Sequence, residues 1–315
     1  MNAVLKPKAL RRGDVVGLVS PAGAVWESVR IDHAVRYLEG RGYRVEVGAH
    51  ARGNDGAFAA SDADRLADLN AMFRDPRIRA VFATRGGYGT ARLLEGIDYA
   101  AVRRDPKIVV GYSDITALQL GLWRRTGLVT FSGPLAAVEF AAGPDPYTEE
   151  QFWRLVTSSK VPGRLEMPAG TAPVTACGGV AEGVLLGGCL SLVASLLGTR
   201  FSPRYAGSIL FLEDVHEHIH RIDRLLVQLR LAGVLRQANG IVLGEFTGAT
   251  AAVPARPSHT LAQTLGSALA GLGIPRINGF PYGHIPRKAT LPIGLRARLD
   301  ADRGSLGFLE SAVVR

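Results

Sequence analysis

The sequence has 315 residues, of which 47% are hydrophobic and 21% charged, a balance typical of an ordinary globular protein with room for two domains. Its net charge of +9 comes almost entirely from arginine, but the basic residues are scattered rather than gathered into runs. This distribution argues against a nucleic-acid-binding protein. No apolar run approaches the roughly 20 residues that a membrane-spanning helix needs, so no membrane partner is expected.

The first apolar segment, Val15–Val19, follows several basic residues and precedes Ala22-Gly-Ala24, an arrangement that invites comparison with a secretory signal. The segment is shorter than the roughly 7–15 residues of a signal core. We therefore predict a buried first strand in a cytoplasmic protein. Cys177 and Cys189 have the spacing of neither a disulfide framework nor a metal site, which fits a reducing compartment.

Strands and helices are predicted to alternate along the first half of the chain. Strands are expected at 14–20, 43–47, 80–84, 108–110 and 128–132, and helices at 27–41, 62–74, from about 90, and from 115 to about 125. This alternation predicts a parallel sheet with helices on both faces. Because ligands of such sheets bind at the carboxyl ends of the strands, the turns at Pro21, Arg85 and Ser113 should meet at one edge.

The composition changes between Gly143 and Gly179, where prolines and glycines predict a linker. We place an N-terminal α/β domain at 1–150, the linker at 151–178 and a C-terminal domain at 179–315. In the C-terminal domain the expected strands are 208–213, 240–244 and a segment from 295, and the expected helices are 190–197, 222–231 and 260–272.

A short apolar strand, a tight turn and a helix over residues 107–120 place Ser113 on the turn. A serine in this position points outward, beside backbone N–H groups and the positive end of a helix, which suits a nucleophile whose attack creates an oxyanion. The alternative is that Ser113 or Asp114 only caps the helix.

Residues 85–89, Arg-Gly-Gly-Tyr-Gly, follow another predicted strand. A phosphate loop is incomplete here, because the three-glycine fingerprint breaks at Arg92 and no Walker lysine is present, although a non-catalytic nucleotide-binding protein stays a hypothesis. The N–H groups of Gly87 and Asp114 could instead form an oxyanion hole beside Ser113. The alternative is a glycine turn that is needed only for positive φ.

An acid and a base for this serine are found in the second half of the chain. Glu213 ends a strongly apolar strand, and His284 lies in a turn that two prolines make rigid. A hydroxyl nucleophile needs a base within reach and an acid that orients the base, roles that Glu213 and His284 could fill for Ser113. The Gly-x-Ser-x-Gly elbow of α/β-hydrolases is absent, because Ile115 replaces its second glycine.

His216, His218 and His220 stand at every second position just after Glu213. On a strand these histidines would share one face, which could hold zinc in a metallohydrolase. The acidic residues around them are equally typical of a solvated loop, and no further ligand at metal spacing completes the set. The metallohydrolase remains an alternative.

Several of these motifs occur together in an order that resembles the LD-carboxypeptidase family of serine peptidases. They are Ser20–Gly23, Arg85–Gly89, Gly111–Asp114, Gly187–Gly188, Gly198–Thr199, Leu212–Asp214, Ile222–Arg224 and Gly283–Pro292. The resemblance implies an N-terminal Rossmann-like parallel-sheet domain and a smaller C-terminal α/β domain of a swivelling, barrel-like type. It also implies a triad shared between the domains, with Ser113 from the first and Glu213 and His284 from the second.

The usual activity of this family is hydrolysis of the L,D-peptide bond to the terminal D-alanine of murein tetrapeptides during cytoplasmic cell-wall recycling. The resemblance implies a muropeptide substrate, no metal or other cofactor, and a homodimer. Arg85 and Tyr88 are our candidate substrate-binding residues, and either Arg85 or Arg287 could hold the terminal carboxylate. Because the segment 216–220 departs from the family pattern, the sister activity, hydrolysis of the peptidyl-nucleotide toxin microcin C, stays open as an alternative.

Overall fold

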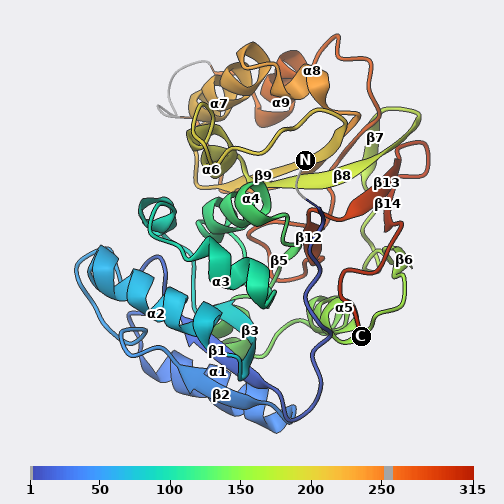
Figure 1. Ribbon diagram of the computed structural model, residues 1–315. Helices are drawn as coiled ribbons and strands as arrows, with labels where there is room; N and C mark the ends of the chain where they lie inside the picture. The colour runs from blue at the N-terminus through green and yellow to red at the C-terminus, as the bar shows by residue number, and fades with distance from the viewer. Residues whose placement is uncertain (1–2, 252–257) are drawn as a thin grey trace.

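We analysed the protein as a computed structural model, which describes residues 3–251 and 258–315. The chain folds around two β-sheets with helices packed on them (Figure 1). The predicted first strand is confirmed, since Val15–Val19 forms β1 and each of its residues is buried. Within the described residues, no helix combines the length and apolar character needed to cross a membrane.

The first sheet is the N-terminal one, with the strands mostly parallel as predicted. Its strands are, in spatial order, β12 (Leu291–Ile293), β5 (Thr130–Ser132), β4 (Ile108–Gly111), β3 (Ile78–Ala83), β1 and β2 (Arg44–Val47). Strand β12 is antiparallel to β5 and comes from far along the chain. The C-terminal half therefore supplies one edge of the N-terminal sheet.

Helices cover both faces of this sheet. They are α1 (Val29–Gly40), α2 (Asp62–Arg74), the 3₁₀ turn η1 (Thr90–Leu93), α3 (Tyr99–Arg104), α4 (Ile115–Thr126), the π-helical turn η2 (Ala136–Phe140) and α5 (Pro146–Thr157). On one face Gly17 of β1 lies against Met72 of α2, with 2.5 Å between an added Cβ and the sulfur. On the other face the ring of Phe82 packs against those of Phe140 and Phe152.

The second sheet is mixed and carries the remaining helices. Its strands are, in order, β6 (Gly163–Arg164), β14 (Ser305–Phe308), β13 (Arg296–Asp300), β8 (Val180–Cys189), β9 (Ser208–Val215), β10 (Gly240–Thr247), β11 (Arg276–Asn278) and β7 (Val174–Cys177). Its helices are α6 (Leu190–Ser195), α7 (Ile219–Leu231), α8 (Val234–Gln237) and α9 (Leu261–Ala268). The predicted two-domain α/β fold class is confirmed.

Two segments differ from the elements expected from the sequence. The helix predicted from Thr90 is a single 3₁₀ turn, which begins after Gly89 in a left-handed conformation. The predicted linker, 151–178, contains the end of α5 and the short strands β6 and β7. Helix α5 forms among the prolines because the Asp145 side chain caps it and Pro146 occupies its first turn, where no N–H donor is needed.

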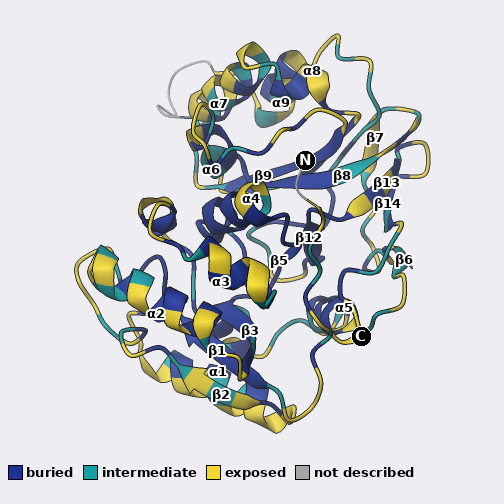
Figure 2. Cartoon of the chain, viewed as in Figure 1, coloured by how far each residue is buried: buried dark blue, intermediate teal, exposed yellow. Residues whose placement is uncertain are grey.

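The two sheets meet beside the serine turn. A Cβ added to Gly188 would lie 2.5 Å from Oγ1 of Thr116, and that oxygen accepts a 3.2 Å hydrogen bond from the backbone N–H of Cys189. Cys189 is in turn the register partner of Glu213 on the neighbouring strand. The strands at this junction are buried (Figure 2). Close packing therefore sets helix α4, which follows Ser113, against the strand pair that carries Glu213.

Gly187→Ala should destabilise the fold strongly. Its φ of +145° disfavours a side chain, and the added Cβ would lie 1.8 Å from the carbonyl oxygen of Phe211, a backbone atom of the adjacent strand. We expect the free energy of unfolding in urea to fall by about 3 kcal/mol or more. Gly266→Ala is the matched control, since an alanine Cβ there meets nothing within 4 Å and should stabilise helix α9 by about 0.5–1 kcal/mol. Equal stability of the two variants would contradict this account of the junction.

Candidate active site

The strand, turn and helix predicted around Ser113 are present. Strand β4 ends at Gly111 and helix α4 begins at Ile115, so Ser113 lies in the turn between them. Its φ of +65° places it in the left-handed region, which non-glycine residues seldom adopt and which is enriched at functional sites. The side chain remains partly exposed, while both neighbours in sequence are buried. The fold thus presents this hydroxyl at the carboxyl edge of the sheet.

The glycine loop after β3 touches the serine. A Cβ added to Gly86 would lie 2.7 Å from both Cβ and Oγ of Ser113, so only glycine allows the two backbones to come this close. Gly87, the residue chosen from the sequence as an oxyanion donor, has a φ of +116°, and a Cβ added to it would lie 3.2 Å from the α-carbon of Gly23. The glycine loop thus lies against the serine turn, but the sequence carried no signal for which glycine packs on the serine.

The capping alternative is wrong for Asp114. This residue is the N-cap of helix α4, but its side chain makes no capping hydrogen bond to that helix. Its carboxylate instead accepts a 2.8 Å hydrogen bond from the N–H of Thr90, and Asp114 is only 3% exposed. The bond ties the glycine loop to the serine turn. The backbone N–H of Asp114, which is the predicted second oxyanion donor, takes no part in this bond.

Glu213 and His284 form a direct pair. The Nδ1 atom of His284 lies 2.7 Å from Oε2 of Glu213. Glu213 is fully buried on β9, whereas the imidazole is 18% exposed. Gly283 makes room for the carboxylate, because a Cβ at its φ of +126° would lie 2.9 Å from the same oxygen. The Thr247 hydroxyl donates a 3.3 Å hydrogen bond to the His284 carbonyl, which also fixes the turn.

The environment of Glu213 is electrostatically unusual. Burial raises the pKa of its carboxyl above the ordinary value, and the hydrogen bond and charge of His284 oppose that rise. The other carboxylate oxygen, Oε1, has no hydrogen-bond partner within the described residues. The imidazole is therefore the principal group that holds this carboxylate in place. A carboxylate bonded to Nδ1 leaves Nε2 as the basic nitrogen of the ring.

Tyr112 connects the serine turn to the histidine. Its ring lies edge-on to the imidazole of His284, with 5.0 Å between ring centres and 67° between planes. No hydrogen bond between the hydroxyl of Ser113 and the imidazole is present in residues 3–251 and 258–315. Catalytic hydrogen bonds are often long before substrate binds. The ring contact between Tyr112, the residue before Ser113, and His284 therefore shows that the serine turn and the imidazole lie near each other. The turn that carries Ser113 and the Glu213–His284 pair thus meet through Tyr112.

An ion pair beside Tyr112 was not predicted from the sequence. The Nζ atom of Lys288 lies 2.5 Å from Oε1 of Glu139, and the Tyr112 hydroxyl donates to the same oxygen at 2.9 Å. The available signal was the position of a scarce lysine four residues after His284. It is weak, since lysines are usually exposed.

The predicted substrate-binding residues border the glycine loop. Arg85 donates a 2.8 Å hydrogen bond from its guanidinium to the carbonyl of Ala24, and Tyr88 is 60% exposed. Arg287, the other arginine considered for the substrate carboxylate, pairs with Asp145 at 3.1 Å on the wall of an open depression of about 350 Å³. Arg85 is thus the candidate beside the serine loop, and Arg287 is already paired.

The histidine face considered as an alternative after Glu213 does not form. Strand β9 ends at Val215, His216 has a φ of +55°, and His218 precedes helix α7. The rings of His218 and His220 stack with centres 5.7 Å apart. In the described part of the chain, no three His, Cys, Asp or Glu side chains are grouped to hold a metal ion. The metallohydrolase alternative loses the strand geometry on which it depended.

The nucleotide-loop alternative also lacks its structural context. Such a loop places phosphate at the start of a helix that follows the glycines. Here the glycines lead into the four-residue turn η1, and the first N–H of that turn is already bound by Asp114.

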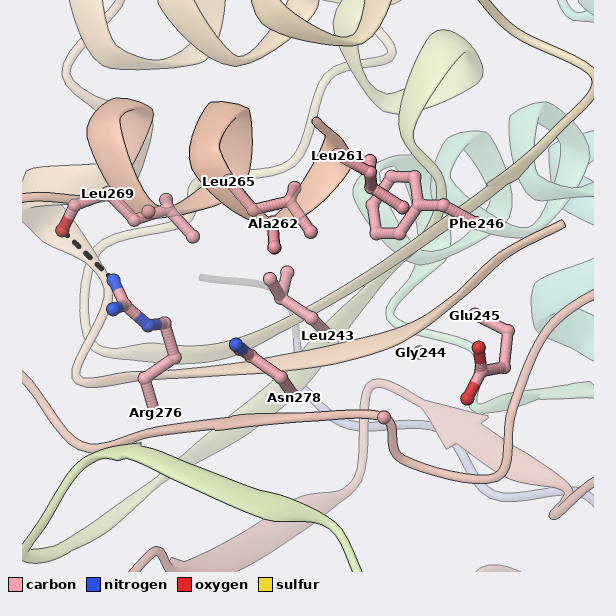
Figure 3. A pocket seen from close by; sticks show the side chains of 12 residues that line it. Leu243, Gly244, Glu245, Phe246, Leu261, Ala262, Leu265, Leu269, Arg276 and Asn278 are labelled. Carbon is pink, nitrogen blue, oxygen red and sulfur yellow. Dashed lines mark hydrogen bonds between the residues drawn. The ribbon is translucent and has the colours of Figure 1, made fainter. Parts of the chain in front are cut away.

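A separate cavity of about 250 Å³ lies between helix α9 and strands β10 and β11 (Figure 3). Leucines of α9 and Leu243 wall it, and Arg276 donates a 3.0 Å hydrogen bond to the carbonyl of Leu269 at one end. None of the predicted triad residues is among the described residues that line it. We therefore assign the chemistry to the serine turn and not to this cavity.

Known proteins share both the sequence pattern and the fold. Residues 16–133 match the LD-carboxypeptidase N-terminal domain, and residues 182–299 match the LD-carboxypeptidase C-terminal domain. The chain is 38% identical to a probable murein peptide carboxypeptidase of Bacillus subtilis, over 94% of this chain and 91% of that protein.

Two solved structures extend the comparison. A muramoyltetrapeptide carboxypeptidase from Oxalobacter formigenes is 32% identical, with a TM-score of 0.79 over 93% of this chain and 97% of that one. The other is the microcin C7 self-immunity protein MccF, known from Escherichia coli, in complex with glutamyl sulfamoyl guanosine. Its sequence is 27% identical to this chain. That structure has a TM-score of 0.90 over 98% of this chain and 99% of its own. Matches to both family domains, in order, show that the chain belongs to the LD-carboxypeptidase family of serine peptidases.

Proposed function

We propose that this protein is a serine-type LD-carboxypeptidase that releases the terminal D-alanine from murein tetrapeptides. The observation that carries the proposal is the buried Glu213–His284 pair, whose imidazole packs beside the strained serine turn. Relatives named as murein peptide and muramoyltetrapeptide carboxypeptidases support the choice of substrate.

In the proposed mechanism Ser113 Oγ attacks the carbonyl carbon of the L,D-peptide bond. His284 takes the hydroxyl proton through Nε2 and passes it to the nitrogen of the departing D-alanine. Glu213 holds the Nδ1 proton and stabilises the charged imidazole. Water then attacks the acyl-enzyme ester with the imidazole again as the base, which releases the shortened peptide and restores the serine.

The oxyanion that forms on the attacked carbonyl needs donors. We assign the N–H groups of Gly87 and Asp114, whose loop and turn are joined by the bond from Thr90 to Asp114. A carboxypeptidase must also recognise the terminal carboxylate. Arg85 is our candidate for that contact and exposed Tyr88 for the adjoining wall of the site.

We also propose that the enzyme acts in the cytoplasm as a homodimer, as the resemblance to the family suggests. Recycled muropeptides are substrates of that compartment, and the two free cysteines fit a reducing environment. Light scattering on the purified protein tests the dimer through a mass twice the 33.5 kDa of the chain.

A second candidate substrate is a peptidyl-nucleotide of the microcin C type. The observation that favours it is the TM-score of 0.90 with MccF, against 0.79 with the muramoyltetrapeptide carboxypeptidase. Mass spectrometry of products from tetrapeptide, tripeptide and microcin C, each incubated with the enzyme, separates the two. We expect loss of one alanine from the tetrapeptide, and cleavage of microcin C alone would favour the second candidate.

Ser113→Ala should lower the turnover of murein tetrapeptide by about 10⁴-fold or more, because the members of a triad act as a unit. D-alanine release measured with a D-amino-acid oxidase assay checks this. Ser195→Ala, an exposed serine on α6, is the control and should keep the wild-type rate. A correctly folded Ser113→Ala protein with undiminished turnover would exclude the mechanism.

Glu213→Gln should lower kcat by about 10³–10⁴-fold, because an amide neither balances the imidazolium charge nor enforces the required tautomer. Asp214→Asn is the matched control, because the Asp214 carboxylate binds the N–H groups of Ser191 and Val215 rather than the imidazole. Its kcat should change by only a few-fold. If both variants lost activity equally, Glu213 would have no special role.

Chelation should leave the activity unchanged, because each step of the mechanism uses only side chains and backbone groups of the chain. We expect equal D-alanine release before and after dialysis against EDTA. Loss of activity on dialysis, with recovery on adding zinc, would revive the metallohydrolase.

A further inference from the structure

We propose that Lys288 is a positioning residue for this reaction: with Glu139 and Tyr112 it clamps the histidine segment onto the serine turn. The proposal rests on the proposed function, in which His284 is the base for Ser113. It assigns a role to a buried ion pair that the triad alone leaves unexplained.

Both carboxylate oxygens of Glu139 are hydrogen-bonded. Oε1 of Glu139 receives Nζ of Lys288 at 2.5 Å and the Tyr112 hydroxyl at 2.9 Å, while Oε2 accepts the backbone N–H of Leu135 at 2.8 Å. The ammonium also lies 3.8 Å from the centre of the Tyr112 ring. One cation therefore holds Tyr112 through both its hydroxyl partner and its aromatic face.

This cation joins the two catalytic segments. Lys288 follows His284 by four residues, and Tyr112 directly precedes Ser113. The Tyr112 ring contacts the imidazole with 5.0 Å between centres. Glu139 belongs to η2, which packs on the N-terminal sheet, so the pair spans the junction between the two halves of the chain. Rotation of the imidazole and sliding of its segment are both restrained by the same contacts.

Because it is buried, the Lys288–Glu139 ion pair is a poor source of stability. Lys288 is 1% exposed, Tyr112 is 5% exposed and the Glu139 side chain is 10% exposed. A buried ion pair can often be replaced by apolar side chains without loss of stability, so its presence beside a catalytic base calls for another reason. Holding a reacting group in place is such a reason, since a 1 Å misplacement can cost about 10²-fold in rate.

The charges of the pair also act on the triad. Burial raises the pKa of Glu213, and the nearby charges of His284 and Lys288 lower it. Burial lowers the pKa of Lys288, and Glu139 and Glu213 oppose that shift. The other groups that face this cluster are Asp214 beside Glu213, and Tyr282 beside Tyr112. With both partners present, the ion pair adds no net charge near the imidazole.

Three variants test the proposal: Lys288→Met, Glu139→Gln and the double variant. The measurement is the rate at which a fluorophosphonate probe labels Ser113, followed from pH 5 to 9, together with D-alanine release from murein tetrapeptide. Labelling reports on the nucleophile and base without depending on the natural substrate. Thermal unfolding shows whether each variant is folded, and the double variant avoids an unpaired buried charge.

The acidic limb of the profile is the pH range over which the labelling rate rises from its low value in acid. The two single variants should shift this limb in opposite directions. Lys288→Met leaves the Glu139 anion, which favours positive charge nearby, so the limb moves up. Glu139→Gln leaves the Lys288 cation, so the limb moves down. The double variant should regain the wild-type limb and melting temperature but label about 10-fold more slowly, because the clamp is gone. Its KM for tetrapeptide should change less than its kcat.

Lys107→Met is the matched control. Lys107 is also 1% exposed and paired, with Asp105 at 2.6 Å, but it precedes the amino end of β4, away from the serine turn. It should lower the melting temperature without moving the limb. The proposal is overturned if Lys288→Met and Glu139→Gln also leave the limb in place, if the double variant labels at the wild-type rate, or if the probe never labels Ser113. Normal labelling shifts without D-alanine release by the wild type would instead refute the proposed substrate.

Discussion

The carboxylate of Glu213 is buried, and His284 is the group that holds it. The 2.7 Å bond from this carboxylate to Nδ1 of His284 accounts for features of the two segments that carry these residues. Gly283 is a glycine because any Cβ would collide with the carboxylate, and the strand that carries Glu213 is apolar because it lies in the centre of the second sheet. Burying this carboxylate is costly, and the proposed role of the same bond in orienting a base gives a reason for that cost.

The second constraint is that the proposed nucleophile and the proposed base are carried by different halves of the fold. Their relative position depends on tight contacts at the junction, where β12 completes the N-terminal sheet and Gly188 fits against Thr116. The proposed clamp of Lys288 and Glu139 adds a polar contact to this apolar junction. Small shifts between the halves would misplace the proposed base relative to the proposed nucleophile.

The sequence predicted those parts of the site that depend on local pattern. The strand, turn and helix around Ser113 have a clear periodicity, and the motifs at Glu213 and His284 have a familiar order. It could not place contacts that depend on packing between distant segments: Asp114 binds a backbone group 24 residues away, and Lys288 binds a carboxylate 149 residues away. The alternation of the histidines after Glu213 left a strand and a solvated loop open, and packing decides between them: the chain turns at His216 and continues into a helix.

In the proposed mechanism Ser113 forms an acyl-enzyme with the peptide left after D-alanine departs. The most direct measurement is a single-turnover reaction of excess wild-type enzyme with murein tetrapeptide, quenched in acid and mapped by peptide mass spectrometry. We predict a transient adduct, equal to the tetrapeptide acyl group without its terminal alanine, on the peptide that contains Ser113. Release of D-alanine with the adduct on a different residue, or with no adduct at any quench time while a Ser113→Ala protein stays active, would contradict it.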